Sequence, residues 1–317
     1  MDAPQSSKRA NPYVSTDEYP EKRQTVRILL SDETSKPDLT DEPINSKDDG
    51  EDAKPSFERE KFPYGNYRNY YDDRRNKGKD YDSRLDLLDA SLFEKKQVLD
   101  IGCNSGNISV IIAQRYGPSF VKGVDIDKHL IGKAQSVLRI AYSLQNPEKA
   151  SDNASPIDLS MRFHYFPRSM TNLFGFVPMS TPPSFTSTDF PHNVHFQEGD
   201  WMELEDEKKY DTILALSVTK WIQLHRGDEG IKAFFMKIFE ALNPGGTLVL
   251  EPQNFDTYHR RAKMNEKTQS IFDNIKLLPE NYKDFLMNEV GFSEMKELGV
   301  SDHDRKGFKR PLFLYIK

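Results

Sequence analysis

The sequence predicts an α/β domain with a seven-stranded, mostly parallel sheet and helices on both faces. Three observations predict this fold class. Short apolar runs typical of buried strands alternate with segments of helical periodicity from residue 97 onward. The first run, residues 97–101, leads into a turn with two glycines and then into an apolar helix. Two further runs, 293–298 and 312–316, predict a closing antiparallel hairpin at the C-terminus.

The composition of the 317-residue chain changes near residue 61. Residues 1–61 are rich in Asp, Glu, Lys, Ser and Pro and hold few large apolar side chains. Such a segment cannot bury enough surface to offset the entropy lost on ordering, so we expect a disordered polar tail. Residues 62–317 are long enough for one domain with one core. Within it we interpret the Pro/Ser-rich residues 145–193 as an insertion, whose aromatic side chains could stack on bases or cover the core.

Charge and cysteine content narrow the functional classes. A net charge of −6 does not favour a non-specific nucleic-acid binder, although a local basic site is compatible with it. The single cysteine, Cys103, excludes an internal disulfide and a zinc site with several cysteines, and so indicates a reducing compartment. No stretch has the apolar core of a signal peptide or the length of a membrane span. We therefore expect an intracellular, soluble protein without a membrane partner.

The first expected elements precede the sheet. Tyr64, Tyr67, Tyr71 and Arg74 are three or four residues apart, which predicts a helix after Gly65 with these side chains on one face. Such a face could cover a cofactor or bind a phosphate, or it could simply dock on the core. A second helix is expected to start at residue 84 and to run toward residue 93.

The turn after the first strand has the features of a nucleotide-cofactor loop. Gly102 and Gly106 have no side chains to hold a ligand away from the backbone, and the N–H groups that open the next helix point at this space. Asn104 stands where many such loops have glycine, and it tolerates the left-handed conformation better than most residues. The loop lacks the G-x-G-x-x-G and G-K-[ST] patterns, so S-adenosylmethionine fits better than a dinucleotide or a triphosphate. Cys103 is interpreted as a packing residue because no partner histidine lies nearby in the sequence.

Acids follow the second and third expected strands, residues 120–127 and 194–201. Asp125 lies 23 residues after Gly102, a spacing that places a carboxylate on a ribose diol. The alternative is structural, because any doubly wound domain can have an acid that caps the next helix, here predicted at 127–144. Asp200 could accept from an adenine amino group while Trp201 packs nearby. Capping and core packing explain these two residues nearly as well.

Polar residues follow the fourth and fifth expected strands, 210–216 and 247–253. Because ligands of doubly wound sheets gather beyond the carboxyl ends of the strands, segment 217–225 is expected to face the reacting centre. A helix is predicted to open at residue 227, and further helical stretches are expected up to residue 276 and at 279–288. Residues 258–263 form a basic cluster. The basic run 305–310 is interpreted as a solvated loop, with contact to an RNA phosphate backbone as the alternative.

Six short motifs occur in order along residues 62–317, outside the predicted insertion. They are YGNY (64–67) with Tyr70 and Tyr71, LDIGCN (99–104), LSVTKW (216–221), GDEG (227–230), LEPQ (250–253) and KGFKRP (306–311). Together they resemble the bicoid-interacting, methylphosphate capping enzyme family. The resemblance implies a Rossmann-like class I S-adenosylmethionine-dependent methyltransferase. It also implies that the terminal (γ) 5′-phosphate of a small non-coding RNA is methylated to a monomethyl phosphate cap.

The resemblance further implies a cofactor, partners and site residues. We expect S-adenosylmethionine, no metal, a small nuclear RNA 5′ end with ribonucleoprotein proteins as further partners, and a monomer. The expected location is the nucleus, with the cytoplasm as the alternative. Carried over by motif, Arg74, Lys220 and His225 would hold the phosphate. The cofactor would be lined by Tyr71, Arg84, Gly102, Cys103, Asn104, Asp125, Ile126, Asp127, Asp200, Trp201 and Leu216.

The residues are compatible with more than one acceptor of the methyl group. A phosphate oxygen is already ionised at neutral pH, so its methylation needs alignment and charge neutralisation rather than a strong base. Methylation of a ribose 2′-O would need deprotonation by Lys220 with a lowered pKa or by His225. A 5′-monophosphate could take the place of a 5′-triphosphate. From a different class, the alternative is an RNA-binding ribonucleoprotein scaffold with a methyltransferase fold.

Overall fold

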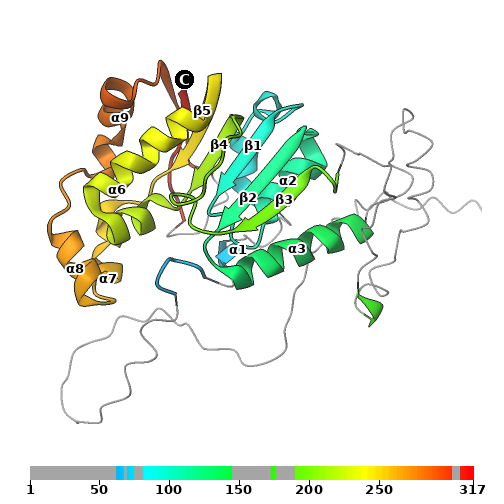
Figure 1. Ribbon diagram of the computed structural model, residues 1–317, viewed down its shortest axis with the longest axis horizontal. Coiled ribbons are helices and arrows are strands. Elements are labelled where there is room, and N and C mark those ends of the chain that lie inside the picture. The colour runs from blue at the N-terminus through cyan, green and yellow to red at the C-terminus, as the bar shows by residue number, and fades with distance from the viewer. Residues whose placement is uncertain (1–61, 68–69, 75–80, 145–172, 176–189, 302–307) are drawn as a thin grey trace, which may run out of the picture. The chain divides into compact units, whose positions relative to one another are not determined.

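The computed structural model describes residues 62–67, 70–74, 81–144, 173–175, 190–301 and 308–317 (Figure 1). The predicted tail, 1–61, and most of the predicted insertion lie outside these ranges, so both stay predictions. Within the ranges no helix is both long enough and apolar enough to cross a membrane.

A seven-stranded sheet runs through the described part of the chain. In spatial order its strands are β3 (Val194–Glu198), β2 (Phe120–Asp125), β1 (Gln97–Ile101), β4 (Tyr210–Leu216), β5 (Leu242–Glu251), β7 (Leu312–Ile316) and β6 (Glu294–Gly299). Strands β1 to β5 are parallel, whereas β7 pairs antiparallel with β5 and with β6. The order reverses between β1 and β4, the kind of switch point where doubly wound sheets bind ligands. This topology confirms the predicted Rossmann-like fold of a class I methyltransferase.

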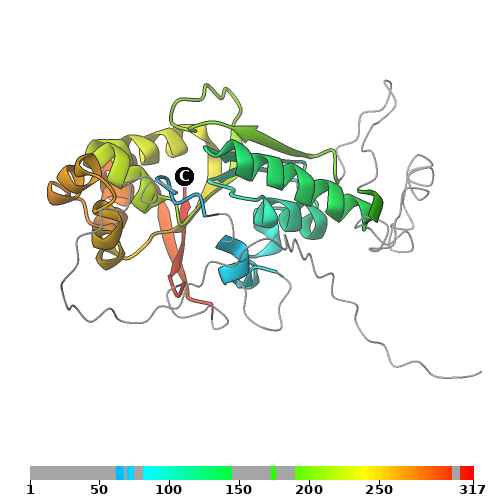
Figure 2. The same ribbon diagram turned by 90° about the horizontal axis from the view of Figure 1, so that it is seen from below.

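Helices cover both faces of the sheet (Figures 1 and 2). They are α1 (Tyr70–Arg74), α2 (Asn107–Tyr116), α3 (Lys128–Ser143), α6 (Thr219–Ala241), α7 (His259–Ala262), α8 (Glu266–Asp273) and α9 (Tyr282–Phe285). Successive strand residues point to opposite faces because of the pleat. Leu99 and Ile213 therefore pack in one apolar cluster with α6 and α9, whereas Val98 and Leu214 pack in a second cluster with α2 and α3.

Two predicted helices are replaced by shorter turns. The helix expected at 84–93 is wrong, because two 3₁₀ turns, Ser83–Leu87 and Ala90–Leu92, lie there. Asp82 and Asp89 each accept a hydrogen bond from a backbone N–H two residues on, so each starts its own turn. The stretch 279–288 likewise divides into a 3₁₀ turn, α9 and a π-helical turn.

The helix predicted to follow Gly65 is also shorter than expected. α1 begins at Tyr70, so Tyr64 and Tyr67 do not share a helical face with Arg74. The preceding backbone is fixed by contacts with other elements instead, because a Cβ at Gly65 would lie only 2.0 Å from the Trp221 ring. We call residues 62–67 the N-terminal strap.

α6 starts earlier than predicted and is kinked once. Gly227 has φ 66° and ψ −164°, which interrupts the helical geometry. The helix predicted to open at residue 227 is therefore the second half of α6, and the first half carries Lys220 and His225. Strands β2 and β3 end earlier than predicted, at Asp125 and Glu198, so the residues that follow lie in loops at the carboxyl edge of the sheet.

Candidate cofactor and phosphate site

The loop after β1 is tied to the neighbouring strand β2. The backbone N–H groups of Gly102 and Cys103 both donate to the carbonyl of Val124, at 2.8 and 3.0 Å. Gly102 has φ 73°, and a Cβ there would lie 2.3 Å from Val218, so this position requires glycine. Asn104 has a positive φ of 51°, the conformation that asparagine was expected to tolerate. The predicted cofactor loop is thus a defined left-handed turn.

Asp125, the predicted ribose ligand, lies beside this loop. Its carboxylate accepts from the backbone N–H groups of Asn104 at 2.8 Å and of Asp127 at 3.0 Å, and burial raises its pKa. Each carboxylate oxygen has two acceptor sites, so both oxygens could still accept from ribose hydroxyls. Asp127 caps α3 through the N–H of His129 at 2.7 Å, and Ile126 between the two acids is 37% exposed. The structure brings these predicted residues together, whereas ribose binding stays a prediction.

The N-terminal strap, blue in Figure 1, connects α6 with the residue that caps α3. His225 donates from Nε2 to the carbonyl of Pro63 at 2.7 Å, and its ring centre lies 4.7 Å from that of Tyr64. At the other end of the strap Asn66 donates to the carboxylate of Asp127. His225 therefore holds the strap in this structure, and its contact with a phosphate stays a prediction.

Three buried polar atoms near this edge have no hydrogen-bond partner among the residues that the structure describes. They are Oδ1 of Asn66, the hydroxyl of Tyr67 and Nε1 of Trp201. A buried polar atom left without a partner costs roughly 1–3 kcal/mol, so such atoms mark places where a ligand or water completes the site. Two belong to the strap and the third to the loop after β3.

Three of the predicted cofactor residues are buried in the loop after β1 or in the core around it. The hydroxyl of Tyr71 donates to the carbonyl of Cys103 at 3.4 Å. Burial raises the pKa of the Cys103 thiol well above its ordinary value, as expected of a packing residue rather than a nucleophile. Leu216, at the end of β4, shares an apolar cluster with Tyr71.

Asp200 and Trp201 lie in the loop after β3. This loop is joined to the ribose candidate because the N–H of Gly199 donates to the carbonyl of Asp125 at 2.9 Å. Asp200 pairs with Arg226 at 2.6 Å, and Trp201 is only 3% exposed within the core. Both residues therefore border the predicted cofactor site while they also take the structural roles that were their alternatives.

Arg74 and Arg84 lie in a buried ion-pair network with Asp82 and Glu251. Glu251 accepts from Arg74 at 2.7 Å and from Arg84 at 2.6 Å, and Asp82 pairs with Arg84 at 2.7 Å. Against the opposing effect of burial, Arg84 and Arg74 hold the pKa of Glu251 below its ordinary value. We call these four residues the balanced network, because each guanidinium has a carboxylate partner. The predicted contacts of Arg74 with phosphate and of Arg84 with cofactor stay predictions.

Lys220, in the first turn of α6, has a different electrostatic setting. Its side chain is buried, and Nζ lies 3.4 Å from the hydroxyl of Thr257. No carboxylate of the described residues forms an ion pair with this ammonium. Burial, and then the charges of Arg310 and Arg261, lower the pKa of Lys220 to about 7. We call Lys220, Arg261 and Arg310 the cationic cluster, and its charge is that of an anion-binding site.

Arg261 and Arg310 were not among the predicted site residues. Arg310 donates to the hydroxyl of Ser217 at 2.8 Å, and the guanidinium of Arg261 lies 5.1 Å from the ring centre of Tyr67. Both residues come from the basic runs 258–263 and 305–310. The runs themselves were the available signal, but a run of basic residues does not show which side chain turns inward.

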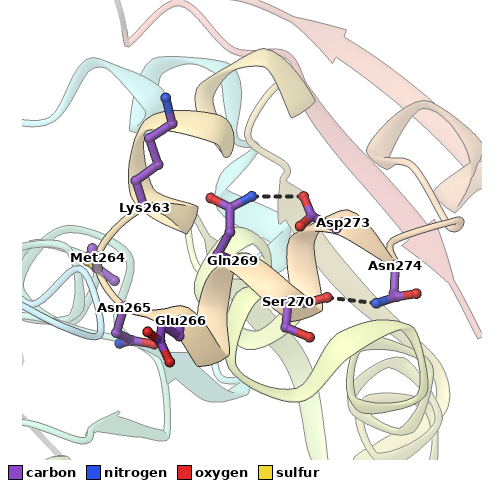
Figure 3. A pocket seen from close by; sticks show the side chains of 8 residues that line it. All are labelled: Lys263, Met264, Asn265, Glu266, Gln269, Ser270, Asp273 and Asn274. Carbon is purple, nitrogen blue, oxygen red and sulfur yellow. Dashed lines mark hydrogen bonds between the residues drawn. The ribbon is translucent and has the colours of Figure 1, made fainter.

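A separate hollow lies on α8 and the residues before it (Figure 3). Its polar side chains pair locally, because Gln269 donates to Asp273 and Asn274 donates to the carbonyl of Ser270, both at 2.8 Å. It shares no residue with the predicted site and offers no convergent set of donors. Across the described ranges, no group of three or more His, Cys, Asp or Glu side chains could hold a metal ion.

Comparisons with known proteins agree with the motifs. The family model described as Bicoid-interacting protein 3 (Bin3) matches residues 210–317. The U6 snRNA methylphosphate capping enzyme Amus of Drosophila melanogaster is 36% identical over 259 residues, which cover 81% of this chain and 75% of that protein. The 7SK snRNA methylphosphate capping enzyme of Homo sapiens is 34% identical over 276 residues, or 81% and 40% of the two chains. The pre-miRNA 5′-monophosphate methyltransferase of Xenopus laevis is 25% identical over 219 residues, or 65% and 72%.

Proposed function

The chain belongs to the Bicoid-interacting protein 3 family, and from this membership we propose that it methylates the 5′-phosphate of a small RNA with S-adenosylmethionine. Relatives above 30% identity from Drosophila melanogaster and Homo sapiens are named as snRNA methylphosphate capping enzymes. We further propose that the acceptor is the terminal γ-phosphate of a 5′-triphosphate end, which becomes a monomethyl phosphate cap.

The cationic cluster is the observation that carries this proposal. A buried ammonium without a carboxylate partner is unfavourable, and a phosphate placed beside it would remove that penalty. The three cations come from α6, from α7 and from the segment before β7, so they converge from distant parts of the sequence. A terminal phosphate with close to two negative charges matches this convergence better than a neutral hydroxyl does.

The residues around the loop after β1 fit S-adenosylmethionine, which supplies an electrophilic methyl group when it is bound. Asp125 would accept from the ribose hydroxyls. The unpartnered atoms of Asn66, Tyr67 and Trp201 would take up polar groups of the cofactor. Gly102 lets the loop pack directly against Val218, because a side chain at this position has no room.

The residues of the chain would act by holding the acceptor and neutralising its charge. The backbone of Lys220 is preorganised for phosphate binding, because Gln253 accepts from its N–H at 3.1 Å and fixes the first turn of α6. A terminal phosphate oxygen is ionised near neutral pH, so no side chain has to remove a proton. The ammonium form of Lys220 is the one that binds phosphate, and the phosphate in turn raises the pKa of Lys220.

One observation favours a second acceptor. A lysine with a pKa of about 7 could also act as the general base for a ribose 2′-hydroxyl. A 5′-monophosphate is a further alternative, because one relative is named for that substrate. Ribonucleoprotein partner proteins, a monomeric state and a nuclear location stay predictions from the family resemblance.

Transfer of a labelled methyl group to three otherwise identical RNAs tests the proposal. The RNAs carry a 5′-triphosphate, a 5′-monophosphate or a 5′-hydroxyl. We expect most label on the triphosphate RNA, and we expect hydrolysis of the phosphoanhydride bonds to release it with the terminal phosphate. Label on the hydroxyl-ended RNA or on an internal nucleoside would contradict the proposal and favour ribose or base methylation. No transfer despite cofactor binding would favour the scaffold.

A further inference from the structure

A single lysine holds the loop that follows β3. Lys237, in the second half of α6, donates from Nζ to the carbonyls of Trp201 at 2.8 Å, Met202 at 3.0 Å and Leu204 at 2.8 Å. These contacts use all three N–H groups of the ammonium. The ammonium also lies 5.0 Å from the ring centre of Trp201. We call residues 200–204 the adenine-side loop, after the adenine contact predicted for Asp200 and Trp201.

The adenine-side loop begins with a turn of its own, because the carbonyl of Asp200 accepts from the backbone N–H groups of Glu203 at 2.9 Å and Leu204 at 3.1 Å. Lys237 binds three carbonyls that this turn does not pair. No backbone N–H of the described residues donates to the carbonyls of Trp201, Met202 or Leu204. No carboxylate in the same part of the chain forms an ion pair with Lys237 either. The ammonium and the three carbonyls therefore satisfy one another, and removing the ammonium would leave the carbonyls unpaired.

The adenine-side loop borders the predicted cofactor site. The backbone N–H of Gly199, directly before it, donates to the carbonyl of Asp125. The loop also holds the unpartnered Nε1 of Trp201. A change in the path of the loop would therefore move groups next to the ribose candidate.

A second cation holds the opposite side of the same loop. Arg226 pairs with Asp200 at 2.6 Å and with Glu203 at 2.7 Å. These contacts are weaker ties, because Arg226 is a third exposed and solvent screens its charge. Lys237 is the stronger candidate for fixing the conformation of the loop, because its three acceptors are backbone carbonyls.

We propose that Lys237 is a positioning residue, which holds the adenine-side loop in the conformation that receives the adenine end of the cofactor. This inference rests on the proposed function. It assigns Lys237 no contact with the cofactor and no part in the chemical step.

Cofactor affinity in three variants of the full chain tests the inference. Lys237→Met keeps the length and apolar stem of the side chain but removes the three donors. Lys237→Arg keeps the charge and donors. The control is Lys232→Met on the same helix, whose ammonium is paired only with Glu229, at 3.0 Å, among the described residues. Binding of S-adenosylhomocysteine by calorimetry is the main readout, with hydrogen exchange of residues 200–204 and the thermal midpoint beside it.

We expect Lys237→Met to weaken S-adenosylhomocysteine binding about tenfold and to speed exchange in the adenine-side loop. The KM for RNA should stay unchanged, Lys237→Arg should recover most of the affinity, and Lys232→Met should match the natural protein. Equal affinity in Lys237→Met would overturn the inference. So would a loss that matches only the fraction of unfolded protein or affects RNA and cofactor alike. Absence of binding by the natural protein would instead contradict the proposed function.

Discussion

The balanced network and the cationic cluster are neighbouring groups of charged side chains that differ in whether carboxylates pair with the cations. In the balanced network Arg74 and Arg84 each face a carboxylate, whereas in the cationic cluster Lys220 faces two guanidinium groups and no carboxylate that the structure describes. The hydroxyl of Ser217 joins the two groups, because it donates to Glu251 and accepts from Arg310.

This difference separates support of the fold from binding of an anion. Paired charges satisfy one another, so the balanced network ties α1 and the turn at 83–87 to the end of β5 without needing a ligand. An unpaired buried ammonium is costly in the free protein and is compensated when an anion arrives. The sequence motifs treated Arg74 and Lys220 alike, and only their charged neighbours distinguish them.

The largest expected effect comes from breaking the balanced network. Glu251→Gln would leave two buried guanidinium groups facing one carboxylate, so we expect a loss of about 3–5 kcal/mol in the free energy of unfolding. Denaturant unfolding measures this loss. The control is Glu294→Gln on the exposed face of β6, which should change stability by less than about 0.5 kcal/mol. A stable Glu251→Gln variant would mean that the network does not hold the fold.

A substitution in the cationic cluster should lower activity without lowering stability. Lys220→Met removes an unpaired buried charge, so stability should stay equal or rise, while kcat/KM for methyl transfer should fall about 100-fold. Steady-state kinetics with 5′-triphosphate RNA and a thermal scan give the two values. Lys232→Met is the matched control for loss of one lysine. A variant that unfolds more readily but transfers normally once folded would place Lys220 with the structural charges.

The pH dependence of transfer sharpens the role of Lys220. Its pKa of about 7 in the free protein means that the phosphate-binding ammonium is lost at higher pH. We therefore expect kcat/KM to fall by about tenfold per pH unit well above pH 7, and Lys220→Arg should remove this limb. A general base would give the reverse, with kcat/KM rising through pH 7.

The same pKa predicts the stability of the free protein. The folded-state pKa of Lys220 lies below its ordinary value, so the unfolded chain binds more protons between about pH 7 and that value. The contribution of Lys220 to stability should therefore rise with pH across this window. Lys220→Met should abolish that part of the rise, which chemical unfolding at several pH values can measure.

The smallest expected effect concerns the unpartnered hydroxyl of Tyr67. Tyr67→Phe removes a buried hydroxyl that has no hydrogen-bond partner in the described part of the chain, so stability should change by less than about 1 kcal/mol. Binding of S-adenosylhomocysteine should weaken about fivefold if the cofactor completes this site. Tyr64→Phe, at an exposed tyrosine of the same strap, is the control. Equal affinity in both variants would remove Tyr67 from the cofactor site.

The sequence predicted the fold well where one physical signal dominates. Apolar runs and glycine turns located all seven strands, because a parallel sheet buries both faces of its strands. It failed for the helices before β1. There Asp82 and Asp89 start separate turns, and Gly65 fits against Trp221, a residue far away in the sequence. Residue spacing alone carries no information on such contacts.

The sequence predicted which segments form the candidate site, but it did not predict which of the charged side chains there are paired. Motifs led to the cofactor loop, to Asp125 and to Lys220, and the structure brings the loop and Asp125 together. The pairing of Arg74 with Glu251 and the gathering of Arg261 and Arg310 around Lys220 depend on tertiary contacts between distant segments. For that reason the sequence could not show that Arg74 has a carboxylate partner whereas Lys220 has arginine neighbours.

The most direct test of the cationic cluster compares the binding of two RNAs that differ only at the 5′ end. With S-adenosylhomocysteine present, no transfer occurs, so affinity reports binding alone. The natural protein should bind 5′-triphosphate RNA at least about tenfold more tightly than 5′-hydroxyl RNA, and Lys220→Met should lose most of this preference. A preference that survives intact in Lys220→Met would show that the phosphate binds elsewhere and would contradict the account.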